Sequence, residues 1–204
     1  MEEEFDRIRA ALDTEDEKRE LILKQGRHII RYCSNSIKKL HRGDTEGGKT
    51  DLEEARQLFK QINDAKKELN NSNVMNSLQV TYQEYAEAWL FLNFLEKGDL
   101  LSFNDDLFKT VEMPVHCYVQ GICDFTGELS RKFLDILRAK DIEKASEIFE
   151  FIQDIYSNLV SLDYPNGLVP GLKRKTDVVR MVLEKSRTTL TQAVIITDRS
   201  TANR

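Results

Sequence analysis

The run from Leu78 to Glu96 contains neither glycine nor proline, and its apolar residues recur at the spacing of an α-helix. Intervals of three and four residues align one apolar set on a single helix face. That set is Leu78, Tyr82, Tyr85, Trp89 and Leu92. The opposite side also carries large apolar residues, including Phe91 and Leu95. A helix that is apolar almost all round is buried on both sides, so this run predicts the central helix of a helical protein.

The composition favours helices joined by short loops over a β-sandwich or barrel. Only three prolines and nine glycines occur in 204 residues, of which 32% are charged and 40% hydrophobic. This length suffices for one sizeable core, so we expect a single all-α domain of about seven helices over residues 1–204. The expected helical ranges are 5–42, with fraying near 13–16, then 51–69, 78–96, a short piece at 100–110, 114–139, 141–162 and 172–196. A turn is expected at 70–73, and Gly98 is expected to cap the central helix.

The charge and cysteine content narrow the class of protein. A formal net charge of -5 argues against a strongly basic nucleic-acid binder, although it allows a local basic surface. Three cysteines inside helical patterns favour a reducing compartment over a disulfide framework. No apolar run approaches the roughly 18 residues that span a membrane, and the acidic start is unlike a signal peptide. We therefore expect a soluble, cytoplasmic protein with no membrane partner.

Four carboxylates on two of the expected helices form the candidate active site. Glu84 and Glu87 are three residues apart in the central helix, and Asp124 and Glu128 are four apart in 114–139. Such spacings place each pair on one helix face, and two faces can meet at a helix crossing. Oxygen ligands without an imidazole favour Mg²⁺ or Mn²⁺ over Zn²⁺ or Fe. The alternatives are a solvated Glu84–Glu87 pair and a Glu128 that pairs with Arg131 or Lys132 in its own helix.

A basic stripe lies on the first long helix. Lys24, Arg27, Arg31 and Lys38 share one face, away from the expected core residues. Most such stripes are simply solvated, and this one becomes a candidate phosphate-binding surface if the carboxylates form a nuclease site. Arg27, Arg31 and Lys38 are the leading candidates for contacts with nucleic acid.

The segment Gly43 to Thr50 matches the phosphate-binding pattern GxxxxGK[ST]. A phosphate-binding loop of this type follows a buried strand in a parallel sheet, whereas this segment follows the basic-faced helix. We interpret it as a polar, glycine-rich connection between two helices. A nucleotide hydrolase that uses Lys49 is the weaker reading.

Two segments resemble the family of translin and translin-associated factor X (Trax). The pattern Tyr118-x-x-Gly121-x-x-Asp124-x-Thr126-Gly127-Glu128-Leu129 is similar to the signature helix of Trax, and Glu84-Tyr85-x-Glu87-Ala88 resembles the Trax segment that precedes it. Residues 27–42 are similar to the first long helix of the family. The acidic positions of the Trax pattern match Glu84, Glu87 and Asp124, with Glu128 at the fourth position.

The resemblance implies a seven-helix, translin-like bundle that assembles into an octameric shell around single-stranded or short duplex nucleic acid. Trax-type subunits are Mg²⁺-dependent endoribonucleases, whereas translin serves mainly as a binding scaffold. The chain lacks a long N-terminal extension and a large insert between the acidic helices, which suggests a compact, archaeal-type form that builds a homo-oligomer.

We therefore expect an endoribonuclease, a phosphodiester hydrolase, that uses Mg²⁺ or Mn²⁺ to cleave single-stranded or short, nicked RNA. Glu84, Glu87 and Asp124 are expected to bind the metal, and Glu128 to bind it or to position the attacking water. The alternative is a non-catalytic, translin-type protein that binds single-stranded nucleic acid. Binding of single-stranded DNA is left open.

Overall fold

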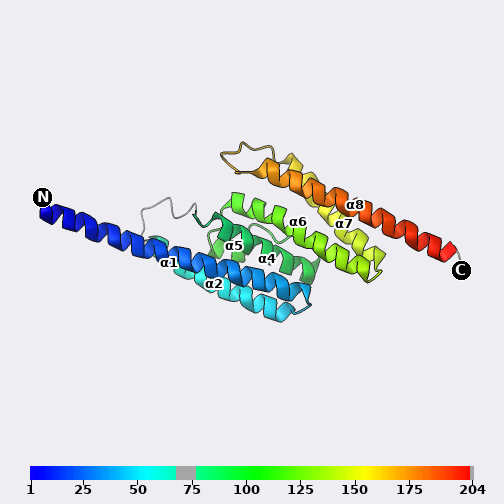
Figure 1. Ribbon diagram of the computed structural model, residues 1–204, viewed down its shortest axis with the longest axis horizontal. Helices are drawn as coiled ribbons and strands as arrows, with labels where there is room; N and C mark the ends of the chain where they lie inside the picture. Colours follow the sequence, from blue (N-terminus) through cyan, green and yellow to red (C-terminus); the bar gives the residue numbers. More distant parts are fainter. Residues whose placement is uncertain (68–76, 203–204) are drawn as a thin grey trace. The chain divides into compact units, whose positions relative to one another are not determined.

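The computed structural model of the protein describes residues 1–67 and 77–202. Seven α-helices occupy these ranges (Figure 1), which confirms the all-α prediction. They are α1 (Glu2–His41), α2 (Thr45–Lys67), α4 (Gln79–Lys97), α5 (Asp106–Thr110), α6 (Val115–Arg138), α7 (Ile142–Ser161) and α8 (Leu172–Ala202). The expected turn at 70–73 lies outside the described residues.

The chain divides into two compact units, Met1–Tyr118 and Val119–Arg204, and helix α6 runs through the boundary. Unit 1 contains α1, α2, α4, α5 and the first turn of α6. Unit 2 contains the rest of α6 with α7 and α8. A single domain over residues 1–204 stays a prediction, and each unit is described by itself. No helix in the described ranges is long and apolar enough to cross a membrane.

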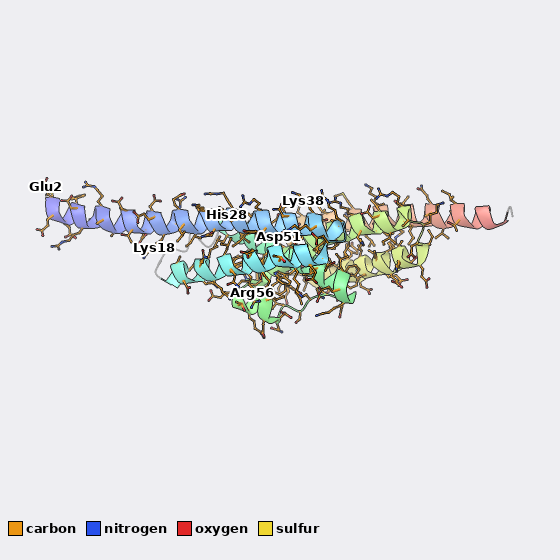
Figure 2. All side chains as sticks on the ribbon, turned by 90° about the horizontal axis from the view of Figure 1, so that it is seen from below. Glu2, Lys18, His28, Lys38, Asp51 and Arg56 are labelled. Atoms are coloured by element: carbon orange, nitrogen blue, oxygen red, sulfur yellow. The ribbon has the colours of Figure 1, made fainter. Side chains whose placement is uncertain are left out.

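In unit 1, α1 and α2 lie side by side as an antiparallel hairpin (Figure 1). At its far end Gln25 Nε2 donates to Gln61 Oε1 at 2.9 Å, and near the turn the Lys39 Nζ to Asp51 Oδ2 distance is 2.7 Å. Figure 2 shows Asp51 on the side of α2 next to α1, where this ion pair forms. Polar contacts thus join the two helices at both ends of their interface.

The glycine-rich segment 43–50 is mostly helical, so its interpretation as a connection is wrong beyond residue 44. Asp44 starts α2 early because its Oδ1 accepts from the Gly47 backbone N–H at 2.9 Å, a helix N-cap contact. Gly48 then faces α1, where an added Cβ would lie 2.8 Å from Leu40 Cδ2 and 2.9 Å from Leu40 Cγ. The glycine pattern therefore serves a close approach of α1 and α2.

Helix α4 packs against both α1 and α2 and supplies the centre of the unit 1 core. Tyr82, Tyr85 and Trp89 are buried, and Phe59 of α2 stacks on Tyr82 at 5.0 Å and meets the edge of Tyr85 at 4.9 Å. Gly98 adopts the left-handed conformation that ends the helix, as predicted. The opposite side is less buried than expected at its start, since the Val80 side chain is largely exposed.

Unit 2 is built on α6, whose apolar residues face α7 and α8. Phe125, Leu129 and Phe133 are buried, and the Phe125 ring meets the Phe151 ring of α7 edge-on at 6.4 Å. Helix α7 begins where the Asp141 carboxylate accepts from the Lys144 backbone N–H. Helices α7 and α8 pack side by side (Figure 1), so the three helices enclose a small core.

The two longest helices, α1 and α8, are more extensive than the sequence predicted. Helix α1 is continuous through residues 13–16, where fraying was expected, and α8 continues past 196 to Ala202. Three glutamates occupy the first turn of α1, where their negative charges interact favourably with the positive end of the helix dipole. Ion pairs such as Arg7–Glu3, 3.0 Å, and Arg9–Asp6, 2.9 Å, add support one turn apart. The side chains of this first part of α1 are exposed, and it extends past α2 (Figure 1).

A matched pair of glycine substitutions tests the helix packing. Gly48→Ala is expected to lower the free energy of unfolding by about 1 kcal/mol, because overpacking against buried Leu40 outweighs the gain in helix propensity. Gly127→Ala is expected to raise it by about 1 kcal/mol, because an added Cβ there meets nothing within 4 Å. Urea denaturation measures both, and equal signs for the two substitutions would contradict this packing.

Tyr118 gives a pH-dependent test of unit 1. Its hydroxyl donates to the Leu101 carbonyl, and burial raises its pKa to about 12 from an ordinary 10.0. Because the folded pKa lies above the unfolded one, the stabilisation is complete below pH 10 and is lost as the pH rises toward 12. Tyr118→Phe should therefore cost about 1 kcal/mol at pH 7, and its deficit relative to wild type should narrow above pH 10.

The exposed Tyr164 supplies the control, since Tyr164→Phe should change stability little at every pH measured. Denaturation midpoints at pH 7, 9 and 11 make the comparison. A Tyr118→Phe deficit that stays constant across this range would show that the hydroxyl titrates normally in the folded protein.

Candidate metal centre

Glu84 and Glu87 are both half-buried on α4, a helix that packs against α1. The buried Cys33 of α1 lies within electrostatic reach of both carboxylates. Burial raises the pKa of the Cys33 thiol well above its ordinary value, and the negative charges of Glu84 and Glu87 raise it further. The two carboxylates, three residues apart, thus both act electrostatically on the same buried thiol. The fully solvated pair that the sequence left open does not describe these side chains.

Asp124 lies on α6 in unit 2, where it forms an ion pair with Lys175 in the first turn of α8. The Lys175 ammonium also donates to the Gln120 backbone carbonyl at 3.4 Å. The Lys175 side chain is only 14% exposed, whereas the Asp124 side chain is 38% exposed. The aspartate thus has a protein cation on one side and solvent on the other.

Glu128, one turn further along α6, is also half-buried. Its Oε2 lies 4.0 Å from Arg131 Nη1 in the same helix, at the limit of an ion pair, and the arginine is largely exposed. Exposed pairs of this kind contribute little to stability. The expected alternative for Glu128, a partner within its own helix, is therefore present as a weak contact.

The four predicted ligands fall two in each unit. Glu84 and Glu87 belong to unit 1, and Asp124 and Glu128 belong to unit 2. Within neither unit do the described His, Cys, Asp and Glu side chains form a group of three that could hold a metal ion. As a donor set, four carboxylates fit a hard divalent cation such as Mg²⁺. Their convergence on one ion stays a prediction.

The predicted basic stripe is exposed on the surface of α1. At about 100° per residue, Lys24, Arg27, Arg31 and Lys38 lie roughly 120–180° around the helix from the buried Cys33. Figure 2 shows Lys38 on the outer edge of α1. Within the ranges that the structure describes, Arg27 and Lys38 form no ion pair, in contrast to Arg7 and Arg9 nearer the N-terminus. Their charge is available to a polyanion.

Lys175 is the residue of the site that the sequence did not single out. The available signal was the start of α8, where Lys173, Arg174 and Lys175 occupy a first turn that has no acidic residue. Positive charges are unfavourable at a helix N-terminus because the backbone N–H groups point there. A basic first turn therefore indicates that something acidic lies nearby, and for Lys175 it is Asp124.

Comparison with known proteins places the chain in a family. A family model described as the Translin family matches residues 17–192. The chain belongs to the Translin family. An uncharacterized protein of Methanocaldococcus jannaschii is 30% identical over 179 residues, which cover 86% of this chain and 76% of that protein. The Translin-associated protein X homolog of Schizosaccharomyces pombe is 26% identical over 197 residues, 91% of this chain and 84% of that protein.

Solved structures agree with this assignment. The complex of AfC3PO with duplex RNA and AfC3PO alone each match with a TM-score of 0.84 and 26% identity, over 95% of this chain and 97% and 98% of theirs. The structure of apo-NeC3PO matches with a TM-score of 0.81 over 93% of this chain and 96% of that one. At 21% identity that likeness shows the fold alone. The Translin-type helical fold is therefore shown.

Proposed function

We propose that this Translin-family protein is a Mg²⁺-dependent endoribonuclease that cleaves single-stranded or short, nicked duplex RNA. The observation that supports the proposal most is the pair of half-buried carboxylates, Glu84 and Glu87, on one flank of a helix in the core. Two carboxylates three residues apart on one helix flank present adjacent oxygen ligands of the kind that a hard divalent cation prefers. Membership of the Translin family and likeness to a Trax homolog and to an RNA-bound AfC3PO agree with it.

The proposed division of labour follows from the chemistry of each side chain. Glu84, Glu87 and Asp124 hold the ion through carboxylate oxygens, and Glu128 either adds an oxygen or accepts a proton from the attacking water. When bound, Mg²⁺ supplies positive charge that polarises the scissile phosphodiester. The exposed Arg27, Arg31 and Lys38 of α1 bind backbone phosphates and hold the strand. This arrangement requires the two units to bring their acidic pairs together.

A direct assay tests the proposal. Purified protein is incubated with end-labelled single-stranded RNA and with short nicked duplex RNA, in Mg²⁺, in Mn²⁺ and in EDTA. We expect internal cleavage in Mg²⁺ or Mn²⁺ and none in EDTA. Single-stranded DNA of the same sequence serves as the control substrate and shows whether cleavage is specific to RNA. Absence of cleavage under every divalent cation would refute the proposed activity.

The second candidate is a non-catalytic protein that binds single-stranded nucleic acid. The ion pair between Asp124 and Lys175 favours it, because a carboxylate held by a lysine is neutralised without a metal. This candidate predicts salt-sensitive binding of single strands with no cleavage. The cleavage assay separates the two candidates, since both functions require RNA binding and only the endoribonuclease produces RNA fragments.

Assembly into a closed homo-oligomer, an octamer by resemblance to the family, remains part of the proposal. Such a shell would enclose the RNA and place several copies of the α1 stripe around it. Multi-angle light scattering of the purified chain, with and without RNA, measures the number of subunits. A monomer under all conditions would contradict the enclosed-shell form of the proposal and leave the metal chemistry to be tested separately.

A further inference from the structure

The contact between Lys175 and Asp124 places a protein cation on a carboxylate that the proposed function assigns to a metal. Lys175 Nζ contacts Asp124 Oδ2 and lies 3.4 Å from the Gln120 carbonyl oxygen. Both partners belong to α6, one turn apart, so the ammonium is held along one face of that helix. The lysine side chain is largely buried, while more than a third of the aspartate remains open to solvent.

Helix stability does not explain why a lysine occupies this position. Lys175 lies in the first turn of α8, where the helix dipole disfavours positive charge. The desolvation of a buried ion pair commonly cancels its attraction, so the pair is weak evidence for a stabilising role. The specific consequence of the contact is electrostatic, because it neutralises Asp124 while no other cation is bound.

We propose that Lys175 is a resident counter-ion of Asp124, which a divalent cation must displace, and that this competition sets the affinity of the site for Mg²⁺. The inference rests on the proposed function, because it takes Asp124 as a metal ligand. A dication and an ammonium on the same carboxylate repel each other, and the repulsion grows as their separation falls. Asp124 keeps a solvent-exposed side at which a divalent cation would bind, and Lys175 would then leave the carboxylate.

This competition makes the charge around Asp124 depend on whether a metal ion is bound. Without the ion, Asp124 is neutralised by Lys175 and presents no net charge to repel an RNA phosphate. With the ion, the carboxylate is used by the metal, and the released ammonium adds a second positive charge beside the bound strand. Lys175 is thus a positioning residue for Asp124, and its effect should be visible in metal binding before any RNA is added.

Three substitutions separate charge from structure. Lys175→Arg keeps the positive charge, Lys175→Gln keeps a hydrogen-bond donor without the charge, and Lys175→Met keeps the apolar stem alone. The probe is Mn²⁺ alone, titrated into the full-length protein in its native assembly and followed by electron paramagnetic resonance of the free ion. Circular dichroism melting of each variant reports whether it is folded.

We expect Lys175→Gln and Lys175→Met to bind Mn²⁺ about tenfold more tightly than wild type, the change that removal of one nearby like charge produces. Lys175→Arg should bind it as wild type does, because the competing charge is retained. In the Asp124→Asn background, Lys175→Gln should have no effect on Mn²⁺ affinity, because the shared carboxylate is gone. A purely structural role would move the melting temperature in all three variants without this charge-dependent order.

The outcomes distinguish this inference from the proposed function. If Asp124→Asn alone leaves Mn²⁺ affinity unchanged, Asp124 is not a ligand, and both proposals lose their basis. If Asp124→Asn weakens binding while Lys175→Gln and Lys175→Met match wild type, only the counter-ion proposal is overturned. Should one neutral variant fail to fold, the other still gives the comparison, and equal affinity in Lys175→Arg and the folded neutral variant overturns the proposal.

Discussion

Replacement of Asp124 by asparagine is expected to lower Mg²⁺-dependent RNA cleavage on the order of a thousandfold, because several kcal/mol of transition-state stabilisation depend on a correctly held ion. Asparagine retains the size of the side chain and loses its charge, so the fold of unit 2 should persist. RNA affinity measured in EDTA should stay within a fewfold of wild type. The measurement is the single-turnover cleavage rate of a labelled RNA at saturating Mg²⁺.

Asp135→Asn is the matched control for this prediction. Asp135 lies on the same helix, its exposed fraction is similar, and it pairs with Arg138 at 3.1 Å, as Asp124 pairs with Lys175. It should cleave at the wild-type rate. Equal rates in wild type and Asp124→Asn would remove Asp124 from the mechanism, and equal losses in both variants would show that the effect comes from disturbing α6.

Neutralising the basic stripe of α1 is expected to weaken RNA binding on the order of 10- to 100-fold at physiological salt. The variant is the triple substitution Arg27→Gln, Arg31→Gln and Lys38→Gln. Loss of three phosphate contacts should flatten the plot of log affinity against log salt by about 2, since each contact to a single strand contributes roughly 0.7. All three side chains are exposed, so the melting temperature should not change.

The same helix supplies a control with an equal change of charge. Arg7, Arg9 and Arg19 are exposed on the first part of α1, and each forms an ion pair one turn or less away, as in Arg19–Glu20 at 3.0 Å. Their triple replacement by glutamine should leave the salt slope unchanged. If both triple variants weaken binding equally, the net charge of the helix matters and the stripe is not a specific surface.

The helical core could be predicted from the sequence because its signals are local. The glycine-free run in α4 and the glycine at its end each specify backbone geometry through residues that are close in the chain. Gly48 and Gly127 show where local reasoning stops. Both are glycines inside helices, yet one presses against Leu40 of α1 and the other faces open space. Only the placement of a partner helix separates the two cases.

The candidate site likewise combines a feature that local spacing predicts with one that it does not. The spacing of Glu84 and Glu87 predicted that they share a helix flank, and their joint effect on the Cys33 pKa supports this. The partner of Asp124 was beyond prediction, because Lys175 is 51 residues away in the sequence and comes from a helix whose register no local rule fixes.

A crystal structure of the protein soaked in Mn²⁺, with anomalous scattering measured to locate the ion, tests the four-carboxylate centre most directly. We expect an anomalous peak bound by carboxylate oxygens of Glu84, Glu87 and Asp124, with Glu128 within reach and Lys175 moved off Asp124. Oxygen ligands at about 2.2 Å would identify the ion as bound and not merely attracted. Acidic pairs of α4 and α6 that point to separate places, with Lys175 still on Asp124 and no peak between them, would contradict it.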